Sequence, residues 1–61
     1  MNDEILRLPN VMALIGLKRS WIYKAISEGK FPPPLQLSDR AVGWRRSDIE
    51  NWMSNRKPRL D

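Results

Sequence analysis

Residues 12–26 read Met-Ala-Leu-Ile-Gly-Leu-Lys-Arg-Ser-Trp-Ile-Tyr-Lys-Ala-Ile, and this segment is the most informative part of the sequence. A helix-turn-helix needs a glycine where the chain reverses, an apolar residue directly after it to fill the angle between the helices, and later apolar residues that face the first helix. These four positions are held, in order, by Gly16, Leu17, Ile22 and Ile26. The stretch therefore predicts two short helices around a tight turn.

Helical periodicity sets the bounds of the two helices. Pro9 suits a first helical turn, and Gly16 ends a helix easily because it enters the left-handed conformation at little cost. Apolar residues at helical spacing are Val11, Leu14 and Ile15 in the first helix, and Ile22, Ala25 and Ile26 in the second. Gly29 closes the second helix. We expect the helix-turn-helix to span residues 9–28, with its second helix at 19–28.

A small β-hairpin and a third helix are predicted after this motif. Prolines at 32–34 require an extended chain. Residues 35–37 alternate in polarity, 38–41 have turn composition, and 42–44 supply a returning strand. Ser47-Asp48-Ile49-Glu50 fits a capping box, and a helix start two residues earlier is the alternative.

The fold class is therefore mainly α with a small β-hairpin, a winged helix-turn-helix of three short helices and a two-stranded wing. Residues 5–8 are either a short strand or an extended arm. Trp44 and Trp52 lie in apolar patterns and belong to the core. We expect one domain at 1–54, followed by a flexible basic C-terminal tail at 55–61, because proline and polar residues break the pattern there.

Composition excludes several classes of protein. The 61 residues include no cysteine and no histidine, which removes disulfides, thiolate nucleophiles, imidazole catalysis and zinc fingers. With no nucleophile–base set or phosphate loop, we expect neither an enzyme nor a cofactor. No apolar run approaches the roughly 20 residues of a membrane span, and no signal peptide is visible. We expect a cytoplasmic protein that has no membrane partner.

The positive charge is concentrated in the middle of the chain. The net charge is +4, and residues 16–46 hold seven cations against two carboxylates, whereas the two flanking segments together are slightly acidic. Such a stretch attracts a polyanion, although a solvated basic face is an equal alternative on charge alone.

The second helix carries most of the candidate contacts. At about 100° per residue, Ser20, Lys24 and Ser27 lie opposite its apolar face, with Trp21 and Tyr23 on the flanks. A polar, basic outward face suits the major groove of DNA, where the first turn and outer side of such a helix reach base edges. The predicted DNA-contacting residues are Lys18, Arg19, Ser20, Trp21, Tyr23, Lys24, Ser27, Arg40 and Arg45.

Each candidate on the helix has an alternative role. Arg19 can pair with a guanine or contact a phosphate, and the alternative is that it is simply a charged surface residue. Ser20 and Lys24 would allow the helix to approach the DNA groove closely, and the alternative is that both side chains are simply solvated. Tyr23 can bond a phosphate, pack its ring on the hairpin, or do both. Trp21 can pack under the prolines or the wing, stack on a sugar, or form a self-association patch, and we favour packing.

The candidates outside the helix are arginines and one lysine. Arg40, at the hairpin tip, suits the adjacent minor groove, with solvation as the alternative. Arg45 and Arg46 either contact phosphates or simply precede the third helix. Arg56, Lys57 and Arg59 are expected to form a solvated tail that adds non-specific, salt-sensitive attraction.

Nearly the whole chain resembles the AlpA family of prophage-type transcriptional regulators. The resemblance is carried by residues 6–11, 15–20, 22–23, 28–32, 40–45, 47–49 and 52, and most specifically by Gly16-x-x-Arg19-Ser20-x-x-Tyr23 together with Arg40-Ala41-Val42-Gly43-Trp44. It implies a winged helix-turn-helix related to phage excisionases and MerR-type DNA-binding domains, with double-stranded DNA as ligand and mobile-element genes as targets.

Three positions depart from the family pattern. Lys18 stands where relatives usually have the serine that caps the recognition helix, so Arg19 or Ser20 has to compensate. Trp21 replaces a small hydroxyl residue, so no base contact is carried over to it. Met12 replaces a common alanine, which requires an adjusted contact between the first two helices.

The expected function is sequence-specific binding of double-stranded DNA by a transcriptional regulator of AlpA type. The alternatives are an excisionase-like architectural protein, that is, a recombination directionality factor, and an inhibitor module that binds another protein. One small module contacts about six base pairs, so we expect a homodimer or a cooperative multimer on DNA. An integrase or RNA polymerase is a further candidate partner. The target sequence and the choice between activator and repressor stay open.

Overall fold

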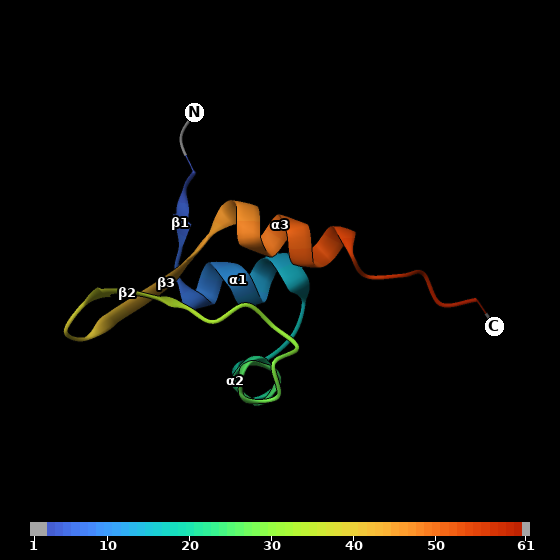
Figure 1. The fold of residues 1–61 in the computed structure, drawn as a ribbon, viewed down its shortest axis with the longest axis horizontal. Coiled ribbons are helices and arrows are strands. Elements are labelled where there is room, and N and C mark those ends of the chain that lie inside the picture. The colour runs from blue at the N-terminus through green and yellow to red at the C-terminus, as the bar shows by residue number, and fades with distance from the viewer. Residues whose placement is uncertain (1–2, 61) are drawn as a thin grey trace.

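Three helices and a three-stranded antiparallel sheet make up residues 3–60, the part of the chain that the computed structural model describes (Figure 1). The elements follow in the order β1 (Ile5–Leu6), α1 (Leu8–Ile15), α2 (Arg19–Ser27), β2 (Leu35–Ser38), β3 (Ala41–Arg45) and α3 (Arg46–Ser54). The predicted winged helix-turn-helix is confirmed, with β2 and β3 as the wing. Residues 1, 2 and 61, which the predicted domain and tail include, lie outside the described part.

In the view of Figure 1, α1 lies between α2 and α3, the wing projects to one side, and the chain after α3 leaves on the other. None of the described helices is long and apolar enough to span a membrane.

α1 begins one residue before Pro9 and ends, as predicted, at Gly16. Gly16 has a φ of 72°, and its N–H donates a 2.8 Å hydrogen bond to the Met12 carbonyl. Leu14, although it belongs to the apolar pattern of this helix, is 40% exposed. The buried or half-buried side chains of α1 are Leu8, Val11, Met12 and Ile15, and at about 100° per residue Leu14 points roughly 100° away from the centre of that face.

α2 ends in a Schellman turn that directs the chain back to the core. The Lys30 N–H donates to the Ala25 carbonyl at 2.8 Å, and the Gly29 N–H donates to the Ile26 carbonyl at 3.0 Å. The reversal brings Phe31 into the interior, where it is almost fully buried. Sequence analysis predicted only an extended chain at the prolines that follow and did not identify Phe31 as a core residue.

The sheet has the strand order β1-β3-β2, so residues 5–6 form a strand and not a free arm. Ile5 pairs with Arg45, and Leu35 pairs with Gly43 on the other side of β3. A Cβ atom on Gly43 would lie 2.7 Å from the Ile5 Cγ2 atom and 2.9 Å from the Leu6 carbonyl oxygen. The central strand therefore needs glycine for β1 to approach this closely.

α3 begins at Arg46, so the capping box predicted at residues 47–50 is wrong and the earlier start is correct. Ser47 lies inside the first turn. Its backbone N–H donates to Asp3 Oδ1 at 3.1 Å, and its hydroxyl donates to Asp3 Oδ2 at 2.7 Å. A carboxylate from the N-terminal segment thus takes the role of the cap, and it complements the positive end of the helix dipole.

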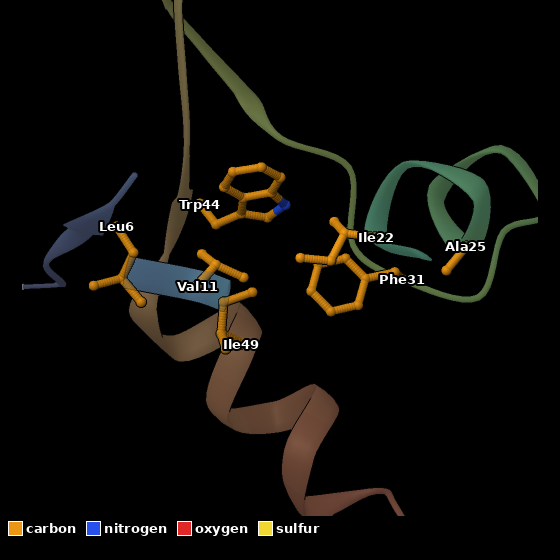
Figure 2. Packing of buried hydrophobic residues seen from close by; sticks show 7 residues of the cluster. All are labelled: Leu6, Val11, Ile22, Ala25, Phe31, Trp44 and Ile49. Atoms are coloured by element: carbon orange, nitrogen blue, oxygen red, sulfur yellow. The ribbon is translucent and has the colours of Figure 1, made fainter. Parts of the chain in front are cut away.

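Side chains from β1, β3 and all three helices meet in one hydrophobic core (Figure 2). The buried cluster consists of Leu6, Val11, Ile22, Ala25, Phe31, Trp44 and Ile49. The Trp44 indole lies above Val11 in Figure 2, with Ile49 below and Ile22 and Phe31 to one side. The core assignment is confirmed for Trp44, whereas Trp52 packs at the edge of the cluster and is half-buried. Leu17, expected to fill the angle between the helices, is also only half-buried.

Candidate nucleic-acid interface

The outward face of α2 is polar and exposed, as its periodicity predicts. Ser20, Lys24 and Ser27 are all exposed, while Ile22 and Ala25 on the opposite face are buried. The Ser27 hydroxyl donates to the Lys24 carbonyl at 2.7 Å, so it is already engaged within its own helix. Ser20 and Lys24 therefore remain the accessible polar groups of this stripe.

The N-terminus of α2 has no side-chain cap. Lys18 is the N-cap residue and has an extended backbone. Within the described part of the chain, no side chain accepts a hydrogen bond from the first-turn amides, and this includes the side chains of Arg19 and Ser20. The compensation expected from those two residues is therefore absent among the described contacts. Exposed first-turn N–H groups carry the positive end of the helix dipole, and this end favours an anion. Lys18 and Arg19 add two cationic side chains at the same place.

Arg19 and Tyr23 lie one helical turn apart and form a pair. The Arg19 guanidinium carbon is 5.7 Å from the centre of the Tyr23 ring, which is 38% exposed. Both residues line a surface hollow of about 650 Å³ whose other walls are Met12, Lys18 and Ser20. The Tyr23 ring therefore lies toward α1 and the turn, whereas one predicted position was against the hairpin.

Trp21 packs against two other aromatic rings. Its ring centre is 6.3 Å from that of Phe31 and 6.0 Å from that of Trp52, both in edge-to-face geometry. The packing that sequence analysis favoured is confirmed, although the partners are Phe31 and Trp52 and not the prolines or the wing. Trp21 keeps a 36% exposed edge on the flank of α2.

Ion pairs divide the basic residues of the middle segment into two groups. Three of them have carboxylate partners: Lys30 with Glu28 at 3.6 Å, Arg45 with Asp3 at 3.9 Å, and Arg46 with Glu50 at 3.1 Å and Glu4 at 3.2 Å. The other four, Lys18, Arg19, Lys24 and Arg40, have no carboxylate within 4.0 Å among residues 3–60. Within residues 16–46, the cations that have no carboxylate partner in the described part of the chain thus lie on α2, at its N-cap and at the wing tip.

The acidic N-terminal segment explains why Arg45 differs from the other candidates. β1 pairs with β3 in the register that sets Ile5 opposite Arg45, and this register brings Asp3 alongside. Hydrogen bonds from Ser47, and to a lesser degree the charge of Arg45, lower the pKa of the Asp3 carboxyl below its ordinary value of 3.8. The junction of β3 and α3 lies across α1 from α2 in Figure 1, so Arg45 is not brought together with the cations of α2.

Arg40 lies at the exposed tip of the wing, in the two-residue turn between β2 and β3. The hairpin carries this cation away from the helices (Figure 1). A register irregularity between Gln36 and Ser38 precedes the tip. Such irregularities increase the local twist of a hairpin and so influence where its tip points.

The start of the C-terminal segment contacts the aromatic cluster. The Arg56 guanidinium carbon is 4.7 Å from the centre of the Trp52 ring. The backbone N–H of Arg56 donates a hydrogen bond to the Met53 carbonyl at 3.1 Å. Arg56 is therefore held against α3, which corrects the expectation of a fully solvated tail. The spacing of four residues between Trp52 and Arg56 is a sequence signal for this contact. Residues 56–60 have no regular secondary structure.

No group of three or more histidine, cysteine, aspartate or glutamate side chains within the described residues is placed to hold a metal ion. The accessible groups on the exposed side of α2 are cations, hydroxyl groups and apolar surface. This combination suits recognition of an anionic polymer with flat edges.

Comparison with known proteins gives consistent results. Residues 4–57 match the family model described as the prophage CP4-57 regulatory protein, AlpA. A protein of Enterobacteria phage P4, uncharacterized protein ORF88, is 44% identical over 54 residues, which cover 88% of this chain but only 61% of the phage protein. The DNA-binding transcriptional activator AlpA of Escherichia coli strain K12 is 34% identical over 59 residues, which cover 87% of this chain and 84% of that protein.

Proposed function

Because this chain belongs to the AlpA family of prophage regulatory proteins, we propose that it regulates transcription of prophage or mobile-element genes by binding double-stranded DNA sequence-specifically. One observation carries the proposal. Within residues 16–46, the four cations that have no carboxylate partner in the described part of the chain lie on α2, at its N-cap and at the wing tip, whereas Arg45 and Arg46, at the junction of β3 and α3, are paired with acidic neighbours. These are the two elements that a winged helix-turn-helix presents to a duplex.

In the proposed complex, α2 enters the major groove with its N-terminal turn foremost. Arg19 pairs with a guanine or holds a phosphate, and Ser20 and Lys24 follow along the groove. Lys18 and the uncapped amides of the first turn suit a backbone phosphate, because helix dipole and side-chain charge act in the same direction. The family homologue of E. coli, which is named as a DNA-binding transcriptional activator, supports this class of ligand.

The wing completes the proposed contact by placing Arg40 in the neighbouring minor groove, where the negative potential favours arginine. Trp21 and Arg45 contribute less in this proposal, because Trp21 is engaged with Phe31 and Trp52, and Arg45 is paired with Asp3. One such module covers about six base pairs, so we propose that two or more copies bind adjacent sites.

Selection of bound sequences from random duplexes tests the proposal. We expect an enriched motif, and affinity for it that falls with salt. Arg19→Ala should weaken binding by about 10- to 100-fold and relax preference at one position, whereas Lys24→Ala should weaken binding to all sequences. Lys57→Ala, in the C-terminal segment, is the matched charge control.

Two results would count against this function. Binding without sequence preference, and no stronger than charge alone provides, would overturn it. Sites phased beside an attachment-site core, in place of sites at promoters, would indicate an architectural role in recombination.

A further inference from the structure

The hollow beside the first turn of α2 is unusual for a cationic surface, because its exposed wall is almost entirely apolar. Met12, a half-buried side chain that packs against the core, and the exposed Tyr23 ring supply apolar surface to its lining. Lys18 and Arg19 line the same hollow, and neither has a carboxylate within 4.0 Å among the described residues. Apolar surface thus lies open beside two cations that no carboxylate of residues 3–60 compensates.

The two cations determine what kind of partner can cover the apolar surface of the hollow. An apolar protein surface would leave these cations desolvated unless it also supplied carboxylates. DNA satisfies both requirements at once, because its phosphates can meet the cations while its base edges approach the apolar surface. The apolar group that base edges expose in the major groove is the C5-methyl group of thymine.

We propose that the hollow formed by Met12 and Tyr23 receives a thymine methyl group, so that a residue of α1 contributes to sequence specificity. This inference rests on the proposed function and adds a ligand subsite to it. Arg19 and the hollow then contact the same or neighbouring base pairs, because the Arg19 guanidinium lies 5.7 Å from the centre of the Tyr23 ring. The volume of about 650 Å³ accommodates the edge of a base together with its methyl group.

Replacing thymine by deoxyuridine tests the subsite, because the exchange removes the methyl group and keeps the hydrogen-bonding edge. In the duplex that binds most tightly after the random selection, the thymines are replaced by deoxyuridine one at a time. The affinity of the unchanged protein is measured for each of these duplexes. We expect one position to lose about fourfold in affinity, the value for burial of one methyl group. It should lie within about two base pairs of the position at which Arg19→Ala relaxes preference.

The Met12→Ala variant assigns the effect to the hollow. In this variant the loss on deoxyuridine exchange should fall below about twofold. Met53→Ala, which truncates another half-buried methionine on α3, should retain the full loss. Because the first measurement uses the unchanged protein, it stands even if Met12→Ala fails to fold.

Different failures have different meanings. If a specific duplex is bound but every deoxyuridine exchange changes affinity by less than about twofold, the subsite is absent while the proposed function stands. The subsite is also overturned if the loss persists in Met12→Ala, or if Met12→Ala abolishes a self-association that forms without DNA. If no duplex is bound specifically, both proposals fail.

Discussion

The indole Nε1 of Trp44 donates a hydrogen bond of 2.8 Å to the carbonyl oxygen of Pro32. The indole Nε1 of Trp52 makes a similar bond, of 2.9 Å, to the carbonyl oxygen of Lys30. The prolines at 32–34 offer no N–H groups, so this part of the segment between α2 and the wing can be anchored to its neighbours only through its carbonyls and side chains. Two tryptophans from β3 and α3 therefore set the position of α2 relative to the wing.

Replacing Trp44 by phenylalanine should destabilise the protein by about 2 kcal/mol. The change leaves the Pro32 carbonyl without its donor and creates a small cavity in the core. Unfolding by urea, followed by circular dichroism, measures the free energy. Trp52→Phe should cost less because Trp52 is half-buried, and equal losses in the two variants would contradict the central role of Trp44.

Substitution of Gly43 by alanine should cost about 1–3 kcal/mol. The added Cβ would lie 2.7 Å from the Ile5 side chain and 2.9 Å from the Leu6 backbone oxygen, so β1 must shift away from β3. A double variant that also carries Ile5→Ala should be less destabilised than the sum of the two single variants, since one of the clashes is removed. Strict additivity in thermal unfolding would argue against this source of strain.

The stability of the folded protein at low pH should depend on the protonation of Asp3. Its pKa is lowered in the folded protein, so its contribution is fully present above the ordinary value of 3.8 and is lost as the pH falls through the folded value. Asp3→Asn should therefore be less stable than the parent at neutral pH, and the difference should vanish in strong acid. Ser47→Ala removes the largest cause of the shift and should raise the pKa of Asp3, which an NMR titration measures.

Lys18→Ser should separate stability from binding. A serine in the same extended conformation can accept a hydrogen bond from the first turn of α2, so the free energy of unfolding should rise by about 0.5–1 kcal/mol. Lys18→Ala removes the same charge without providing a cap. Under the proposed function both variants lose DNA affinity to a similar extent, and a gain of affinity in Lys18→Ser would contradict a phosphate contact at this end of the helix.

Arg56→Ala should destabilise the protein by about 0.5–1 kcal/mol, because the Arg56 guanidinium covers the Trp52 ring at 4.7 Å. Lys57→Ala is the neighbouring control. Urea unfolding of the two variants under identical salt conditions gives the comparison, and equal stabilities would mean that the contact with Trp52 contributes nothing.

Features that depend on local spacing could be predicted from the sequence. Gly16 and Ile22 determine the helix-turn-helix, and the outward stripe of α2 follows from about 100° per residue. Features that depend on distant partners could not be predicted. Phe31 is buried because a Schellman turn reverses the chain, and Asp3 caps α3 across 44 positions because β1 pairs with β3.

The candidate site divides in the same way. The exposure of Ser20, Lys24 and Ser27 could be derived from one helix alone. The ion pair of Arg45 depends on strand register, and the apolar hollow depends on how Met12 of α1 meets Tyr23 of α2. Both are tertiary features, for which periodicity carries no signal.

Only two side chains of α2, Ile22 and Ala25, belong to the buried cluster. Exposed positions on its outer face take no part in that cluster, so substitutions there leave the free energy of unfolding almost unchanged. Under the proposed function, point mutations can therefore alter what this helix recognises while the fold stays intact at every step. Such a helix can then acquire a new DNA preference one residue at a time.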